Sequence, residues 1–431
     1  MLSYSSLTIS GATLINFFNT RVFNFYTDEV KLNLAYIPLV MTIYAIWNAI
    51  NDPLFGWLSD KTRTRLGRRF PYILFGFIPL TIAFAAIWLI PQSLVDSKSQ
   101  ILILLYMITT LLIFDTFYTI VVLNWHSLFP EKFKTSKERN YVSALRQMIS
   151  LIGVILAVVV APLIFEYDNL YSYRKAILII SGFILLGFAL SLYGCRDAKS
   201  ELEPVKKSKS YKKMLGEVLK NKNLISFLVA FGLANVAYLT LLAMLPYYNK
   251  WVLLKSAENE SILYGIGIGA AALAFFFWAR LSLKIGSKAV FIISSIIFSV
   301  ALIPLIFSAN IIVVYIVMGI VGVPLAGLLL VPEVLLSEVI DDDYQKNKQK
   351  REGLFFGFYG FFVRIALIVE SALISLILAI TGYNPESLSQ TNLALTGIKI
   401  LMIGVPAVCF ALGIVVMYRF YDLSKKRLVK T

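Results

Sequence analysis

The most informative chemical feature of this sequence is an acidic residue inside a long apolar segment. Asp52 follows Asn48 and Asn51 at helical spacings that place all three side chains on one face. Tyr44 shares that face one turn earlier, and Pro53 removes a backbone donor, which frees a carbonyl group in the preceding turn. Because carboxylate and amide oxygens are hard donors, we predict a site for a small cation or a proton.

A second acid within an apolar segment, Asp115, is followed one helical turn later by Thr119. Two interpretations of Asp115 are open: a structural pairing with an arginine such as Arg21 or Arg146, or a part in coupling. Intramembrane arginines either neutralise a carboxylate or bind an anionic or hydroxyl-rich ligand. The residues that we expect to contact a substrate are Arg21, Tyr26, Asp115, Tyr118, Trp125 and Arg146.

Basic residues gather in the turn that follows the first acidic helix. We expect this turn to latch the cytoplasmic side of the protein in one of two conformations. Another arginine, Arg364, lies inside a late apolar segment, and we expect it to tune the Asp52 site. The predicted cytoplasmic gate consists of Gly56, Asp60, Arg65, Gly67, Arg68, Arg69, Arg351 and Glu352.

The chain that holds these residues is far more apolar than a soluble protein. Of its 431 residues, 58% are hydrophobic and 15% are charged, and the apolar residues form runs long enough to cross a bilayer. The net charge of +15 comes from basic residues in short connections, which indicates membrane topology rather than nucleic-acid binding. The two cysteines predict no disulfide framework, and the sequence indicates no metal cluster and no catalytic constellation.

The apolar runs predict an all-α polytopic membrane protein of twelve transmembrane helices in two pseudo-symmetric six-helix bundles. The bundles are expected at residues 1–195 and 224–431, joined by a basic cytoplasmic linker at 196–223. Lysine and arginine concentrate in alternate connections, so we expect a plasma-membrane protein with both termini in the cytoplasm. The predicted spans are 6–26, 34–57, 72–90, 101–125, 141–165, 176–193, 224–248, 262–281, 289–307, 311–336, 354–380 and 395–419.

Two short similarities support a duplication of one six-helix unit. Phe25–Thr27 ends the first predicted span, and Tyr247–Asn249 ends the seventh. The basic turn Leu66–Arg69 after the second span is matched by Ile285–Lys288 after the eighth. Repeats of this kind place a substrate site near the bilayer midplane, between the two units.

Several motifs carry a resemblance to a known family. Asn51-Asp52-Pro53, Gly56-Trp57 and Leu66-Gly67-Arg68-Arg69 occur in the order and context of a helix 2 signature, and Arg351–Gly357 adds a later match. The chain thereby resembles the glycoside–pentoside–hexuronide cation symporters of the major facilitator superfamily, over essentially its whole length. The resemblance implies the fold of that superfamily and cation-coupled transport of sugars.

The resemblance also implies a cation site. Asp52, Asn51 and Thr119 match three of the family's ligands, whereas Asn48 stands where the family has a second carboxylate. A sodium site gains from two negative charges, and a proton needs only one carboxylate. This departure therefore favours H⁺ over Na⁺ as the coupling ion.

The substrate part of the resemblance is less complete. Arg146 matches the family's helix 5 arginine, and Arg364 stands in place of a helix 11 lysine. The two sugar-binding acids of the melibiose permease fall on Ala12 and Val122. The region 336–364 is also similar to the lysophospholipid symporters, a sister branch, and an apolar ligand would account for the missing acids.

We therefore expect a monomeric secondary transporter that couples symport of a sugar or glycoside-like solute to a cation by alternating access. Its expected partners are a small-molecule solute and membrane lipid, with no cofactor apart from the coupling ion, H⁺ or Na⁺. The first alternative is a lysophospholipid or amphiphile symporter or flippase of the same fold. A non-transporting membrane receptor is a remoter alternative, and an enzyme is not expected.

Overall fold

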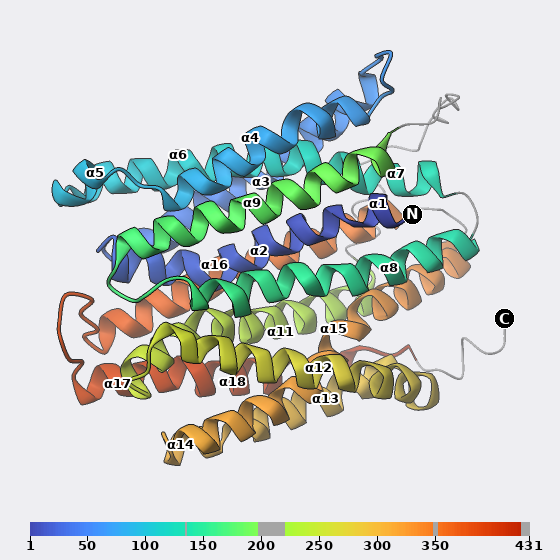
Figure 1. Ribbon diagram of the computed structural model, residues 1–431. Coiled ribbons are helices and arrows are strands. Elements are labelled where there is room, and N and C mark those ends of the chain that lie inside the picture. Colours follow the sequence, from blue (N-terminus) through green and yellow to red (C-terminus); the bar gives the residue numbers. More distant parts are fainter. Residues whose placement is uncertain (134–135, 197–219, 348–351, 424–431) are drawn as a thin grey trace. The chain divides into compact units, whose positions relative to one another are not determined.

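The computed structural model describes residues 1–133, 136–196, 220–347 and 352–423, and these residues form helices and no strand (Figure 1). They divide into two compact units, each described here by itself. The predicted linker at 196–223 falls mostly on residues outside the described ranges. Unit 1 comprises Met1–Pro204, Ser256–Ser261 and Asn384–Leu388, and unit 2 comprises Val205–Lys255, Ile262–Tyr383 and Ser389–Thr431.

Unit 1 contains the helices of the first six predicted spans. Three of these helices continue into π-helical turns, at Phe25–Glu29 (η1), Thr119–Leu123 (η2) and Leu156–Val160 (η3). Such turns occur often at functional sites. The helices are α1 (Leu2–Ser5), α2 (Leu7–Asn24), α3 (Tyr36–Lys61), α4 (Phe70–Trp88), α5 (Gln92–Asp96), α6 (Gln100–Tyr118), α7 (Asn124–Lys132), α8 (Ser136–Ile155) and α9 (Leu170–Cys195).

Unit 2 contains the helices of the last six predicted spans, apart from residues 257–261, the first turn of one of these helices, which belong to unit 1. Two π-helical turns occur here, at Tyr248–Val252 (η5) and Ile400–Gly404 (η6). The helices are α11 (Lys222–Tyr247), α12 (Ala257–Ile285), α13 (Ser287–Leu302), α14 (Pro304–Phe307), α15 (Ile311–Asn347), α16 (Glu352–Ile380), α17 (Asn392–Lys399) and α18 (Val405–Phe420).

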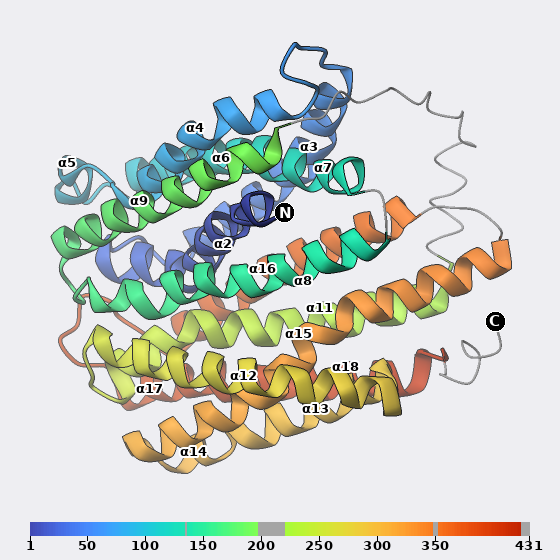
Figure 2. The same cartoon turned by 45° about the vertical axis from the view of Figure 1, so that its right-hand side comes forward.

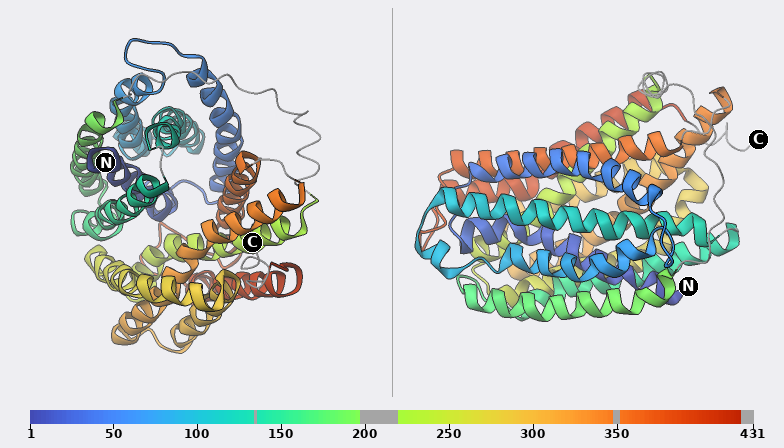
Figure 3. Two further views of the ribbon diagram at one scale, coloured as in Figure 1. Left: turned by 90° about the vertical axis from the view of Figure 1, so that its right-hand side faces the viewer. Right: turned by 90° about the horizontal axis from the view of Figure 1, so that it is seen from above.

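The same packing pattern occurs in both units. In unit 1, α2 packs on α8 and α9, and α4 packs on α6 and α9. In unit 2, α11 packs on α16 and α18, and α13 packs on α15 and α18. The first span of each six therefore contacts the fifth and sixth, and the third contacts the fourth and sixth. Figure 3 shows each bundle in a view along its helices, and the predicted pair of pseudo-symmetric six-helix bundles is confirmed.

The ends of α2 and α11 repeat one backbone device. Each helix passes into a π-helical turn, and two residues after that turn the chain adopts a positive φ, at Lys31 (63°) and at Leu254 (53°). The two turns are closed by equivalent bonds, from Leu32 N to Tyr26 O at 2.8 Å and from Lys255 N to Asn249 O at 3.1 Å. In the structure, Tyr26 is therefore equivalent to Asn249. The sequence comparison of Phe25–Thr27 with Tyr247–Asn249 had paired Tyr26 with Tyr248, one residue earlier.

Ten helical segments of the described residues are long and apolar enough to cross a membrane. The first two predicted spans, α2 and α3, are helical but more polar, because they carry the candidate functional residues. The helix α15 continues to Asn347, well beyond the predicted end at residue 336 (Figure 2). An ion pair one turn apart, Lys346 to Asp342 at 2.5 Å, supports this polar extension.

Candidate functional site

The best-defined polar cluster inside a helix bundle lies between α3 and α6 in unit 1, and we call it the two-acid cluster. It consists of Asn48, Asn51 and Asp52 on α3, Asp115 on α6, and Thr119 at the start of η2. Asn51 and Asp115 are fully buried, and Thr119 is 2% exposed. The helical spacing of the three α3 residues presents them together to α6, which packs on α3.

Hydrogen bonds join all five members of the two-acid cluster. Asn51 Nδ2 donates to Asp115 Oδ2 at 3.0 Å and to Thr119 Oγ1 at 3.1 Å. The Thr119 hydroxyl donates in turn to Asp52 Oδ1 at 2.8 Å, and Asn48 Nδ2 donates to Asp115 Oδ1. The cluster therefore holds two carboxylates in one hydrogen-bonded network inside the bundle.

The chemistry of these groups determines which way the amides point. Carboxyl oxygens accept hydrogen bonds from amide N–H groups, and Asn48 and Asn51 turn their Nδ2 groups toward Asp115. Their Oδ1 atoms are buried, and neither has a hydrogen-bond partner among the described residues. Leaving a buried acceptor unsatisfied costs about 1–3 kcal/mol, which is tolerated when the group serves a ligand.

The structure contradicts one of the two interpretations of Asp115, the pairing with an arginine, and the part in coupling stays a prediction. Its side-chain partners are Asn48, Asn51 and, within hydrogen-bonding reach, Tyr44, all of which are neutral. The pairing with Arg21 or Arg146 that we considered is therefore wrong. Asp115 was predicted from its sequence among the substrate contacts, and the structure places it beside Asp52. Its spacing of one helical turn from Thr119 was the sequence signal that could have linked Asp115 to the predicted cation site.

Arg146, on α8, lies against aromatic rings. Its guanidinium carbon is 4.1 Å from the ring centroid of Trp125 and 5.3 Å from that of Phe129. Its Nη2 lies 3.2 Å from Nδ1 of His126, which must accept because a guanidinium only donates. Trp125 is itself anchored, since it stacks on Tyr4 with ring centroids 5.1 Å apart. A cation held on aromatic faces suits an anionic or hydroxyl-bearing ligand.

Arg21, on α2, forms a buried ion pair that the sequence did not reveal. Its Nη2 contacts Oε2 of Glu260, and both side chains are fully buried. The Tyr167 hydroxyl donates to the other carboxylate oxygen, and the Phe165 ring lies 4.8 Å from the Arg21 guanidinium carbon. All four residues belong to unit 1. Glu260 follows an exposed connection in the sequence, so nothing local indicated its burial.

The other predicted substrate contacts differ in their surroundings. Tyr26 is fully buried, and its hydroxyl donates to the Ile87 carbonyl at 2.8 Å. Tyr118 is partly buried and follows Asp115 on the same helix. Arg364, predicted to tune the Asp52 site, lies on α16 in unit 2. The functional roles of these residues stay predictions.

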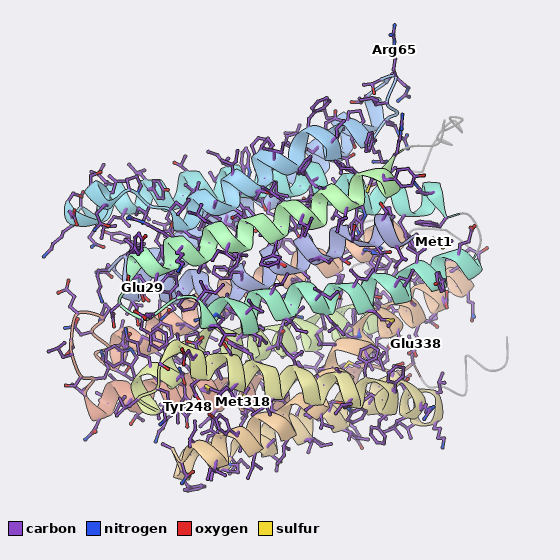
Figure 4. All side chains as sticks on the ribbon, viewed as in Figure 1. Met1, Glu29, Arg65, Tyr248, Met318 and Glu338 are labelled. Carbon is purple, nitrogen blue, oxygen red and sulfur yellow. The ribbon has the colours of Figure 1, made fainter. Side chains whose placement is uncertain are left out.

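The structure describes only some of the residues of the predicted cytoplasmic gate. Gly67 has a φ of 99°, which favours glycine, and its N–H donates to Thr64 O at 3.1 Å. Arg69 is nearly buried, with Nη1 3.4 Å from Ser59 Oγ, whereas Arg65 is exposed and points away from the helices (Figure 4). Gly56 and Arg68 are partly buried. The side chains of Asp60 and Glu352, and the whole of Arg351, lie outside the described residues.

Two six-helix units with carboxylates inside a bundle are the architecture expected of a membrane transporter. The profile of the family described as "MFS/sugar transport protein" matches residues 4–425. The chain therefore belongs to this family, and it is a secondary transporter of the major facilitator superfamily. The similar proteins described below are named as transporters and symporters.

The relatives are distant but aligned over most of their length. The sodium-dependent lysophosphatidylcholine symporter 1 of Gallus gallus is 25% identical, with 93% of this chain and 82% of the relative covered. The inner membrane symporter YicJ of Escherichia coli K12 is 24% identical, with 94% and 87% covered. An uncharacterised symporter of Bacillus subtilis, YjmB, is 24% identical, with 99% and 92% covered.

Solved structures support the fold alone. An inward-facing bacterial homologue of the human lysosomal transporter Spinster superposes with a TM-score of 0.66 at 12% identity, and 100% of this chain and 98% of that chain are covered. The nucleoside transporter NupG superposes with a TM-score of 0.63 at 14% identity, with 98% and 99% covered.

Proposed function

We propose that this protein is a cation-coupled symporter, in which a cation bound at Asp52 drives the uptake of an organic solute by alternating access. The observation that carries this proposal is the two-acid cluster, because intramembrane carboxylates are costly and usually mark ion or proton paths. Asn48, Asn51 and Thr119 shape the site around Asp52.

Coupling requires that the cation and the solute favour the same conformation of the transporter. A ligand shifts a conformational equilibrium only by its difference in affinity between the two states. The cation site lies on α3, and the same helix leads directly into the gate turn around Gly67. We propose that neutralising the α3 carboxylate and rearranging the gate are linked through this helix.

The solute has two candidates of different chemistry. A sugar or glycoside-like solute follows from the helix 2 resemblance and from the family description. A lysophospholipid is favoured by a specific observation, since three relatives at 24–25% identity are lysophosphatidylcholine symporters. In either case, Arg146 on its aromatic faces would contact the polar or anionic part of the solute.

The proposal is tested by replacing Asp52 with asparagine. In proteoliposomes, Asp52→Asn should lower gradient-driven uptake to background, because the cation loses its charged ligand, while solute exchange at equal cation concentrations persists. Asp96→Asn is the matched control, since Asp96 is an exposed acid hydrogen-bonded to Gln92 outside the bundle. Full gradient-driven uptake by Asp52→Asn would contradict the proposal.

The same proteoliposomes separate the two solutes. Uptake is measured with a panel of radiolabelled sugars and glycosides and with a fluorescent lysophosphatidylcholine, each under a proton gradient and under a sodium gradient. Sugar uptake alone supports the first candidate, and lysophospholipid uptake alone supports the second. Ligand binding without flux of any solute would instead favour a receptor.

A further inference from the structure

We propose that Glu370 is a proton-binding site of unit 2, which holds a proton in this conformation and exchanges it with water when the bundle rearranges. Glu370 lies within α16 and is 5% exposed. The five members of the two-acid cluster belong to unit 1, so this site is separate from the proposed cation site. The inference therefore goes beyond the proposed function and holds whichever cation binds at Asp52.

Glu370 lies on the buried side of α16, deep inside its apolar segment. Side chains at intervals of about one helical turn form a buried stripe there, in which the exposed fractions are 2% at Ala366, 5% at Glu370, 0% at Ile374 and 0% at Leu378. The apolar segment spans Phe355–Ile380, so 10 residues, or about 15 Å of helix, separate Glu370 from its nearer end. The carboxyl group therefore has apolar neighbours along this face and lies far from the helix ends.

The helix α11 runs along α16 in the same direction and carries no charge at the level of Glu370. The rings of Phe231 and Tyr359 stack with centroids 4.8 Å apart. Further along, the ring centroids of Tyr247 and Tyr383 lie 5.5 Å apart. Glu370 lies between these two contacts, and the stretch of α11 between them contains no charged residue.

The other elements packed on α16 are α15, α17 and η6. The turn η6 contains no charged residue, and α15 contains none before Glu333. Glu333 acts electrostatically on Tyr359, which lies 11 residues before Glu370 on α16. The acids of α15 are therefore near the beginning of α16, well away from Glu370.

Two basic residues remain, one on α17 and one on α16 itself. Lys399 lies two residues after Gly397, which packs against Thr381 just after the end of α16. Arg364 lies six residues before Glu370, and six residues turn a helix by about 600°, or about 240° beyond a full turn. The side chains of Arg364 and Glu370 therefore project to different sides of α16.

Within the part of the chain that the structure describes, burial is the only influence on the charge of the Glu370 carboxyl. Among the same residues, this carboxyl has no hydrogen-bond or ion-pair partner. A carboxylate buried without a partner is far more costly than a neutral carboxyl group, so this acid binds a proton. The titratable groups on the packed elements that leave it unaffected are Lys222, Tyr238 and Tyr247 on α11, Tyr315, Glu333, Glu338, Asp341, Asp342, Asp343, Tyr344 and Lys346 on α15, and Lys399 on α17.

An acid at this position indicates a role in conformational change. Ionisable residues within membrane helices are rare and usually mark ion or proton paths. A proton bound at Glu370 stabilises conformations in which the carboxyl is buried, whereas conformations that hydrate the carboxyl release the proton. Proton binding thereby biases the transporter toward the conformation in which Glu370 is buried.

Infrared spectroscopy of purified protein in detergent tests the site without any solute or gradient. The carbonyl band of a protonated carboxyl differs from the bands of a carboxylate, and Glu370→Gln removes it while keeping a neutral side chain of similar size. The spectrum of the wild type minus that of Glu370→Gln at neutral pH should contain one carboxylic-acid band, which moves to lower wavenumber after transfer to D₂O. The matched control is Glu258→Gln, an exposed glutamate in the first turn of α12, and the wild type minus this variant should show no such band.

A chemical probe gives the same information on wild-type protein alone, so the test does not depend on the folding of a variant. Dicyclohexylcarbodiimide is an apolar reagent that modifies protonated carboxyl groups, and the modified peptides are quantified by mass spectrometry. At pH 7, labelling of Glu370 should exceed labelling of Glu258 by at least about 100-fold, because an exposed glutamate is less than about 1% protonated at that pH.

The outcomes separate this inference from the proposed function. A carboxylic-acid band that shifts in D₂O, together with selective labelling of Glu370, supports the proton-binding site. Absence of the band from the difference spectrum, or labelling of Glu370 no stronger than that of Glu258, would overturn it. A band that never shifts in D₂O would also overturn it, because the acid would then stay sealed in every conformation. None of these results bears on Asp52, whose role is tested by gradient-driven uptake.

Discussion

At the scale of single residues, the two-acid cluster draws its two acids from two different helices. Asn48 stands where the family that the sequence resembles has an acid, and Asp115 places an acid beside it from α6. Asn51 then bridges the Asp115 carboxylate and the Thr119 hydroxyl, which itself donates to Asp52. A site of this kind depends on charge and geometry, not on which helix supplies the charge.

The residue-scale prediction concerns the buried Arg21–Glu260 pair. Replacing Arg21 alone with methionine leaves a buried carboxylate without its cation, so we expect a loss of about 3–5 kcal/mol in stability. The double replacement Arg21→Met with Glu260→Met should recover much of that loss, because neither charge remains buried. Thermal unfolding in detergent, followed by fluorescence, checks the order of the three melting temperatures. A double variant less stable than Arg21→Met would contradict this explanation.

At the scale of elements, close helix contacts hold unit 1 around α2. Glycine lets α8 approach α2 so closely that a Cβ on Gly153 would lie 2.2 Å from the Ile9 carbonyl oxygen. On α9, a Cβ on Gly187 would lie 2.4 Å from Ser10 Oγ. Small residues at such positions are the usual way in which membrane helices pack, because lipid offers no hydrophobic driving force between them.

The element-scale prediction compares two glycines in membrane helices. Gly153→Ala should destabilise the protein by about 1–3 kcal/mol, because the added methyl group would force α8 away from the α2 backbone. Gly182→Ala, on the exposed side of α9 with nothing within 4 Å, should change stability by less than about 1 kcal/mol. Melting temperatures in detergent would separate the two. Equal stability of both variants would show that α2 and α8 can separate without cost.

At the scale of the whole molecule, the chain repeats one six-helix packing pattern, and we expect its orientation in the membrane to follow from its basic connections. Within unit 1, Met1 and Arg65 lie at one end of the bundle, and Glu29 lies at the other (Figure 4). In unit 2, Tyr248 and Glu338 likewise lie at opposite ends (Figure 4). The basic turn around Arg65 and the chain's first residue therefore belong to the same side, which we expect to be cytoplasmic.

Cysteine labelling tests this orientation. The two native cysteines, Cys195 and Cys409, are buried, so an introduced exposed cysteine should dominate the reaction with a membrane-impermeant maleimide. Ser93→Cys, in α5, should be labelled in intact cells, whereas Arg65→Cys should be labelled only after permeabilisation. Both native side chains are exposed, so a difference in labelling would report which side of the membrane each residue faces. Labelling of Arg65→Cys in intact cells would reverse the orientation.

By itself, the sequence determined the helical spans, their number and the face that joins Asn48, Asn51 and Asp52. These are local properties, since run length and a period of 3.6 residues depend only on neighbours in the chain. Tertiary structure alone decided that Asp115, 64 residues after Asn51, completes the cluster, and that Arg21 pairs with Glu260. Helical periodicity says which residues share a face, but the partner of that face depends on how the helices pack.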